Sequence, residues 1–351
     1  MISNVKLVVG TVLVYVGFWL MAYQNNINTL AIQSEDTLPS LFLPFAILKE
    51  KTLYLDTYYD MMVERYPDPT DRDHKKNLIP FYVKQIRVGE TVHYISAFPL
   101  MSGFLVLPIY FLYGYLGLGI TWEYLAILSH FGGAFIIGLS GVLFRNMLKK
   151  HFLAEDRLVN ILTFVYLFGT INFSLISQAL WQHGPVQLFL ILALDSLLDQ
   201  KDTRAGFYSG LALLRRPTAI IPIALLGLHL LFRGKQINMY KGVQYLAGII
   251  PSILFFVWYT SKYYLGISNN GYSSQVFTEW LGKFPEGFLG LWLSPSKGIL
   301  IYSPVLIFSL VGLYIVLKNK EYEFRQSYLV YASIILIHTI VLGQWKHWFG
   351  G

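Results

Sequence analysis

Cysteine is absent from the 351-residue chain, and charge is scarce. Without cysteine there is no disulfide, no thiolate metal site and no cysteine nucleophile, and the redox compartment cannot be read. Only 13% of the residues are charged, against about a quarter in an ordinary soluble domain. Because 55% are hydrophobic and mean hydropathy is +0.50, a soluble enzyme, a nucleic-acid-binding protein and a disordered chain are disfavoured. We predict an all-α, polytopic membrane protein.

The net charge of +7 does not by itself indicate nucleic acid, because membrane proteins gather lysine and arginine in their cytoplasmic loops. Apolar stretches long enough to cross a bilayer core of about 30 Å predict membrane spans. They are Val5–Tyr23, Glu123–Phe144, Leu158–Ser177, Pro185–Leu198, Gly242–Tyr264, Ile299–Leu317 and Tyr328–Leu342. The first is long for a signal peptide and is followed by no small-residue cleavage site, so we expect a retained span.

Two further apolar stretches are ambiguous. Residues 94–120 contain several prolines and glycines, and residues 205–232 are interrupted by Arg215-Arg216-Pro217. If the first is re-entrant or surface-lying and the second is a hairpin of two short helices, the basic loops fall on the side of Lys6, as the positive-inside rule requires. We therefore predict a cytoplasmic N-terminus, about nine or ten crossings and a large external loop over residues 24–121.

No internal repeat, low-complexity tract or linker divides the chain, so we expect a single transmembrane domain over residues 1–351. A later external loop is expected over residues 265–298. The chain ends directly after a span, within the aromatic and glycine-rich run Trp345–Gly351. This is the ending expected of a C-terminally truncated fragment of a longer protein.

Half of the chain's twenty acids lie in the first external loop. They are Glu35, Asp36, Glu50, Asp56, Asp60, Glu64, Asp68, Asp71, Asp73 and Glu90. Within this loop Thr37–Leu48 is apolar enough to lie on the membrane surface, which would place Glu35 and Asp36 at the interface. Asp36 either caps the following helix, with Pro39 in its first turn, or acts as a general base, with or without a metal, beside a lipid head group. The residue pattern leaves both interpretations open.

A second polar cluster lies in Gln178-Ala-Leu-Trp-Gln-His-Gly-Pro185. A helix boundary with an interfacial tryptophan accounts for Trp181 and the Gly-Pro pair. It does not account for Gln182 and His183, because unpaired polar groups are costly at membrane depth. His183 can exchange a proton near neutral pH and is therefore a candidate site residue.

Arg215 and Arg216 are the most costly residues in an otherwise apolar stretch, since an arginine within a span costs roughly 2.5 kcal/mol or more. Either both reach the interface from a short hairpin tip, or their guanidinium groups bind a phosphate. Lys297, in the later external loop, offers a second cation of this kind. The chain has no P-loop, nucleophile elbow, zinc-protease motif or dinucleotide fingerprint.

Together these segments resemble the GT-C glycosyltransferase-like membrane proteins of bacteria and archaea, multi-span enzymes that use polyprenyl-phosphate-linked sugars. The resemblance covers nearly the whole chain and depends on the order of short motifs. They are Ser34–Pro39 followed by Leu53–Asp56, then Leu180–Pro185, Arg216–Thr218, Ser294–Pro304 and Trp345–Gly351.

The resemblance implies roles for individual residues. Asp36, with Glu35 beside it, matches the family's first-loop catalytic acid, and His183 is taken as a further catalytic candidate. The donor phosphate would be held by Arg215, Arg216 and Lys297, with Trp181, Gln182, Asp56 and Tyr302 as further substrate-binding residues. Many relatives carry an acid where this chain has Trp181 and His183, so a divalent metal ion is left open.

We therefore expect an inverting membrane glycosyltransferase in the inner or plasma membrane, with its site on the external face. Its partners would be a polyprenyl-phosphate sugar donor, a lipid, polysaccharide or protein acceptor, and membrane lipids, with no nucleic acid. The 94–120 element would border the groove that admits the lipid tail. Two alternatives stay open: a transporter or flippase of a lipid-linked saccharide, and a non-catalytic protein of envelope assembly.

Overall fold

The computed structural model describes residues 3–27, 31–152, 155–232, 237–266, 280, 282–296, 298–321 and 325–348. The described chain is mostly helical, and five of its helical segments are long and apolar enough to cross a membrane. They are α1 (Asn4–Gln24), α6 (Trp122–His151), α7 (Asp156–Phe168) with α8 (Ile171–Ser174), α12 (Met239–Tyr263) and α16 (Arg325–Leu342). Shorter apolar helices are α9 (His183–Leu198), α11 (Ile220–Leu231) and α15 (Ile307–Lys318). The mostly helical fold is confirmed, and five segments could span a membrane, as a polytopic membrane protein requires.

Two predicted spans are interrupted, each at a residue that disfavours a continuous helix. The 158–177 stretch breaks after Gly169, where the Thr170 side chain accepts a hydrogen bond from the Asn172 backbone N–H and starts α8. The 299–317 stretch breaks at Ser303-Pro304, between α14 (Ile299–Tyr302) and α15. Proline lacks the backbone N–H that a helix needs there.

The 205–232 stretch forms the predicted helical hairpin. Helix α10 (Asp202–Arg215) ends where Arg216 takes an extended conformation, with φ −150° and ψ 120°. The conformation follows from Pro217, because a residue before proline is disfavoured in the helical region. A 3₁₀ turn over Pro217–Ala219 then leads into α11. The break places Arg216 at the tip of the hairpin.

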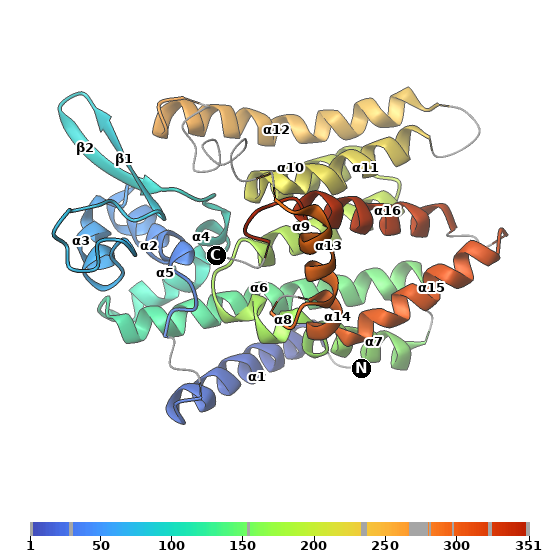
Figure 1. The fold of residues 1–351 in the computed structure, drawn as a ribbon, viewed down its shortest axis with the longest axis horizontal. Helices are drawn as coiled ribbons and strands as arrows, with labels where there is room; N and C mark the ends of the chain where they lie inside the picture. Colours follow the sequence, from blue (N-terminus) through green and yellow to red (C-terminus); the bar gives the residue numbers. More distant parts are fainter. Residues whose placement is uncertain are drawn as a thin grey trace.

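The long helices lie side by side along one direction, while the first loop forms a separate group of short elements at one end (Figure 1). Helices α10 and α12 approach closely through glycine. A Cβ added to Gly248 would lie 2.0 Å from the Thr203 carbonyl oxygen, and one added to Gly206 would lie 1.9 Å from the Tyr245 carbonyl oxygen. Only glycine allows backbones to approach so closely.

The first loop differs from the prediction in two ways. Helix α2 (Leu38–Phe45) does not lie on the membrane surface, because all eight of its residues are buried within the protein. Its apolar side chains form a core with α3 (Asp56–Arg65) that also includes buried side chains of α1, α6 and α12. The loop also contains an antiparallel hairpin, β1 (Val83–Val88) with β2 (Thr91–Ser96), so the fold is not all-α. The hairpin turn includes Gly89, whose φ of +61° favours glycine.

Residues 94–120 form no helix of spanning length. They begin in β2 and continue into α4 (Met101–Leu105) and α5 (Leu107–Tyr115), which has Pro108 in its first turn. The expectation that this stretch does not cross as one helix is confirmed. The later loop contains one short helix in its described part, α13 (Phe284–Leu293).

Candidate functional site

A polar cavity lies where the first loop meets the ends of the helices. Its walls come from segments far apart in the sequence: Ser34, Asp36, Phe81, Phe98, Trp181, Gln182, His183, Arg216, Trp345 and His347. The structure therefore brings together Asp36, Trp181, Gln182, His183 and Arg216, all of which the sequence singled out.

Asp36 lies in a 3₁₀ turn, Glu35–Thr37, directly before α2. The N-cap of α2 is Thr37, and the hydrogen bonds that hold the Asp36 carboxylate come from Ser34 and its own backbone N–H, so a capping role finds no support. The Oδ1 atom is buried without a hydrogen-bond partner in the described chain. Burial raises the pKa of Asp36, while Ser34, Arg215 and Arg216 act to lower it.

A second buried polar atom in this wall, the indole Nε1 of Trp181, also lacks a hydrogen-bond partner among the described residues. Unpaired buried polar groups cost free energy and are rare in folded proteins. An unpaired acceptor on Asp36 and an unpaired donor on Trp181 line the same cavity. This arrangement is typical of a site that binds a polar ligand.

Arg216 and His183 face each other across the cavity wall. The guanidinium Nη1 of Arg216 lies 2.7 Å from Nδ1 of His183, the first residue of α9. The guanidinium can only donate, so the nitrogen that faces it must act as an acceptor. Arg216 supplies a fixed positive charge for an anion, and Asp36 supplies a carboxylate close enough for that charge to lower its pKa.

Arg215, expected to bind the phosphate with Arg216, is instead fully buried. Its guanidinium donates to the Pro99 carbonyl oxygen and to the Ser102 hydroxyl. That hydroxyl in turn donates to the Trp181 carbonyl oxygen over 3.1 Å. Arg215 thus joins three wall segments of the cavity without lining it.

The remaining candidates lie outside the residues that line the cavity. Glu35 faces Arg72 and Asp68, and burial raises its pKa. The Asp56 carboxylate accepts from the Tyr94 backbone N–H over 2.6 Å and lies 2.6 Å from Nδ1 of His93, and so ties α3 to β2.

In the later loop, the Tyr302 hydroxyl donates to the Pro295 carbonyl oxygen over 2.8 Å. This bond spans the turn that leads into α14. Lys297, the second expected phosphate contact, lies outside the described residues.

Five wall residues were not expected as site residues: Ser34, Phe81, Phe98, Trp345 and His347. The last two belong to the terminal run that contributed to the family resemblance. They reach the cavity because α13 holds the turn after α16. Gly282 donates a backbone hydrogen bond of 2.7 Å to the Gln344 carbonyl oxygen, and a Cβ on Gly287 would meet Gly343 at 2.1 Å. The density of aromatic residues and histidine in that run is the signal that could have identified them.

An apolar groove adjoins the polar cavity. Three neighbouring cavities lie along α10 and α12, two of them also bordered by α4, and Leu214 lines all three. Met101 and Phe104 of α4 form one wall, so the 94–120 stretch borders a groove as expected. Pro99 and Pro217 line the groove directly beside Phe98 and Arg216 of the polar cavity. A ligand with a charged head and an apolar tail would fit this pair of cavities.

Three metal-binding side chains of the described chain converge at one place only, His151, Asp195 and Asp199, which is not the polar cavity. The cavity's own potential ligands are Asp36, His183 and His347. Comparisons with known protein families, with curated proteins and with solved structures found no match to the chain.

Proposed function

We propose that the protein is a membrane glycosyltransferase that transfers a sugar from a polyprenyl-phosphate-linked donor to an acceptor hydroxyl on the external face. The observation that carries this proposal is a pair of neighbouring cavities. One is polar and is lined by Asp36 and Arg216, and the other is apolar and is lined by Pro99 and Pro217, the sequence neighbours of Phe98 and Arg216 in the polar cavity. A donor with a phosphate between a sugar and a long hydrocarbon chain needs a polar and an apolar environment next to each other.

Arg216 is the residue best suited to the donor phosphate. Its guanidinium is held by His183, Arg216 lines the polar cavity next to Pro217 of the apolar one, and the guanidinium presents donors in a planar fork that suits phosphate oxygens. Arg215 does not line the cavity but holds the neighbouring backbone in place through its hydrogen bonds to Pro99 and Ser102. Lys297 stays a prediction as a second phosphate contact.

Asp36 is the residue best suited to accept a proton. In the proposed step, the acceptor hydroxyl oxygen attacks the anomeric carbon and its proton passes to the Asp36 carboxylate. The bond between the anomeric carbon and the phosphate oxygen breaks, and its electron pair leaves with the phosphate. Attack opposite the leaving phosphate inverts the anomeric centre. Burial, by raising the pKa of Asp36, makes its carboxylate a stronger base than an exposed one.

The first test compares Asp36→Asn with Glu35→Gln in membranes supplied with a labelled polyprenyl-phosphate sugar. The two variants remove neighbouring carboxylates, but only Asp36 lines the cavity. Loss of a general base typically reduces the rate by about 10²- to 10⁴-fold. We expect a loss of this size for Asp36→Asn and near wild-type transfer for Glu35→Gln. Equal transfer by wild type and Asp36→Asn would contradict the assignment of Asp36.

The same experiment distinguishes the alternatives if translocation of the labelled lipid across sealed vesicles is followed in parallel. A flippase would use the groove and Arg216 but no base. Translocation that survives Asp36→Asn and is lost in Arg216→Met, without any sugar transfer by the wild type, would favour that function. Retained cellular function in a chain with both residues replaced by alanine would favour a non-catalytic role.

A further inference from the structure

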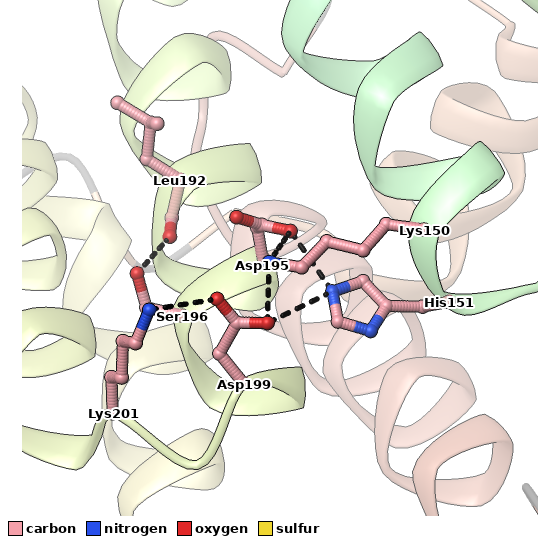
Figure 2. Close-up of polar contacts among 7 residues, drawn as sticks. All are labelled: Lys150, His151, Leu192, Asp195, Ser196, Asp199 and Lys201. Atoms are coloured by element: carbon pink, nitrogen blue, oxygen red, sulfur yellow. Dashed lines mark hydrogen bonds and ion pairs between the residues drawn. The ribbon is translucent and has the colours of Figure 1, made fainter.

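A cluster of metal-binding side chains lies at the opposite end of α9 from the polar cavity. His183 begins α9 at the cavity, and Asp195 and Asp199 lie at its other end. The helix rise of 1.5 Å per residue puts Asp195 about 18 Å from His183 along the helix axis. His151, the last residue of α6, faces the two carboxylates from the neighbouring helix (Figure 2).

The three side chains converge with the spacing of metal ligands. Nε2 of His151 lies 3.0 Å from Oδ1 of Asp195 and 3.5 Å from Oδ1 of Asp199. All three ligand atoms lie within 4.8 Å of one another. In a tetrahedral zinc site with bonds of 2.0–2.1 Å, neighbouring ligand atoms are about 3.3 Å apart. Both distances from the imidazole are close to that value.

The ligand types also suit a transition metal. Imidazole and carboxylate together are a common zinc set, with water in the remaining position. The two carboxylates are four residues apart, on one face of the helix end. The imidazole comes from a second helix and is a ligand of different chemistry, which distinguishes the cluster from a group of surface acids. The side chains of His151, Asp195 and Asp199 are 13%, 23% and 12% exposed, so an ion there would be shielded yet reachable.

Lys150 competes for the same carboxylates. Its ammonium group lies 2.5 Å from Oδ1 of Asp199 and 3.7 Å from Oδ1 of Asp195. Lys201 also contacts Asp199, at 3.4 Å. The Lys150 side chain is 49% exposed, and its long, flexible stem lets the ammonium turn into solvent. A divalent ion would displace the ammonium group from the carboxylates. Lys150 would therefore lower the affinity of the cluster for the metal ion without preventing binding.

We propose that His151, Asp195 and Asp199 form a binding site for a divalent transition metal ion of the zinc class, which joins the end of α6 to the end of α9. The ion would replace the ion pairs of Lys150 with coordinate bonds between the two helices. This site is independent of the proposed transferase chemistry, because none of its residues lines the polar cavity.

Cobalt serves as the probe. The full chain in detergent, freed of metal by a chelator, is titrated with Co²⁺ and followed by visible absorption, which is intense when cobalt is four-coordinate. We expect a single intense site that Zn²⁺ displaces. A thermal unfolding midpoint that rises with Zn²⁺ concentration is also expected, since a ligand that binds only the folded state stabilises it.

Variants locate the site. His151→Gln and Asp199→Asn should each weaken Co²⁺ binding by at least about tenfold, since even outer-shell changes cost 10- to 100-fold. Lys150→Gln should strengthen it, because the competing ammonium is removed while all three ligands stay. His93→Gln is the matched control. His93 faces a single carboxylate, that of Asp56, so its replacement should leave Co²⁺ binding unchanged.

Two results would overturn the proposal. One is the lack of an intense cobalt spectrum in both wild type and Lys150→Gln, which would identify the cluster as an ion-pair network alone. The other is a spectrum that persists in His151→Gln and disappears in His183→Gln, which would place the metal in the polar cavity. Because Lys150→Gln keeps every ligand, the proposal can be tested even if the ligand variants do not fold.

Discussion

Asp36 combines burial with an unpaired carboxylate oxygen, so its charge opposes folding. The raised pKa means that this penalty is absent below the ordinary value of 3.8 and fully present above the raised one. Replacing Asp36 with asparagine should therefore raise the thermal midpoint at pH 7 by a few degrees while transfer is lost. The gain should shrink as the pH falls towards 3.8.

The measurement is thermal unfolding in detergent at several pH values, with Glu35→Gln beside it. Glu35 also has a pKa raised by burial, but it lies outside the cavity wall. The two variants should thus change stability in the same direction and activity differently. Lower stability of Asp36→Asn at pH 7 would show that the carboxylate is satisfied in the folded protein.

Arg215 and Arg216 are neighbours in sequence with opposite expected effects. Arg215→Met leaves the buried Pro99 carbonyl without its Arg215 donor, at a cost of about 1–3 kcal/mol, and removes one of the two partners of the Ser102 hydroxyl. Its thermal midpoint should fall steeply. Arg216→Met removes a half-buried guanidinium and should change stability by less than about 0.5 kcal/mol, while the KM for the lipid-linked donor rises strongly.

Unfolding scans and donor titrations of both variants test this separation. If Arg216→Met lost as much stability as Arg215→Met, both arginines would have a structural role. Unchanged stability in Arg215→Met would show that its buried contacts with Pro99 and Ser102 contribute little.

The sequence identified Asp36, His183 and Arg216 because polar residues in apolar surroundings stand out in any hydropathy reading. It could not separate Arg215 from Arg216, because their difference arises from the end of a helix. Arg215 is the last residue of α10 and turns into the protein, while Pro217 forces Arg216 into an extended conformation. Trp345 and His347 were missed as site residues because their contact with the cavity depends on how α13 packs against the turn after α16.

Among the helices, the α10–α12 pair fixes the position of the cavity, because α10 leads directly into Arg215 and Arg216. A Cβ on Gly248 would overlap the backbone of α10, so Gly248→Ala must push the two helices apart. We expect a loss of about 1–3 kcal/mol, the usual cost of overpacking, together with reduced transfer. Gly312→Ala in α15 is the control, since nothing lies within 4 Å of the added methyl group.

Thermal unfolding and transfer assays of both glycine variants test this packing. Equal stability of Gly248→Ala and Gly312→Ala would contradict the close approach of α10 and α12. A fall in stability of Gly248→Ala with unchanged transfer would show that the cavity does not depend on the position of α10.

The sequence predicted most helices but not the interior of the first loop. Apolar runs such as Thr37–Leu48 carry the same signal whether they meet lipid or protein, because hydropathy reports only the need to leave water. Here α2 packs into a protein core that the loop shares with α1, α6 and α12. The β1–β2 hairpin was hidden for a related reason: Tyr94 to Ser96, in its second strand, belong to an apolar run that continues into α4.

At the scale of the whole described chain, the polar cavity and the His151 cluster lie at the ends of helices. Large apolar side chains on the flanks of the apolar helices face outward: Leu13 of α1 is 67% exposed, Leu254 of α12 is 63% and Phe308 of the shorter α15 is 71%. Side chains of this kind are typical of surfaces that meet lipid. The polar cavity and the His151 cluster lie at opposite ends of α9, so a bilayer around the helices would separate them.

This arrangement predicts on which side of the membrane each end lies. The first loop and the cavity should face outward, and the end of α9 should face the cytoplasm, because the basic loops gather there. The lack of cysteine makes the test direct, since the unaltered chain has no thiol to label. Asp73→Cys and Lys201→Cys place single thiols at exposed positions, in the first loop and just after α9.

A membrane-impermeant maleimide should label Asp73→Cys in intact spheroplasts and Lys201→Cys only after the membrane is permeabilised. Labelling of both from outside would mean that α6, α7 and α9 do not separate the loop from the helix ends as predicted. Labelling of Lys201→Cys alone would invert the orientation. In that case the cavity would face the cytoplasm, where Arg216 would meet soluble phosphorylated donors as readily as lipid-linked ones, and the external transferase would have to be abandoned.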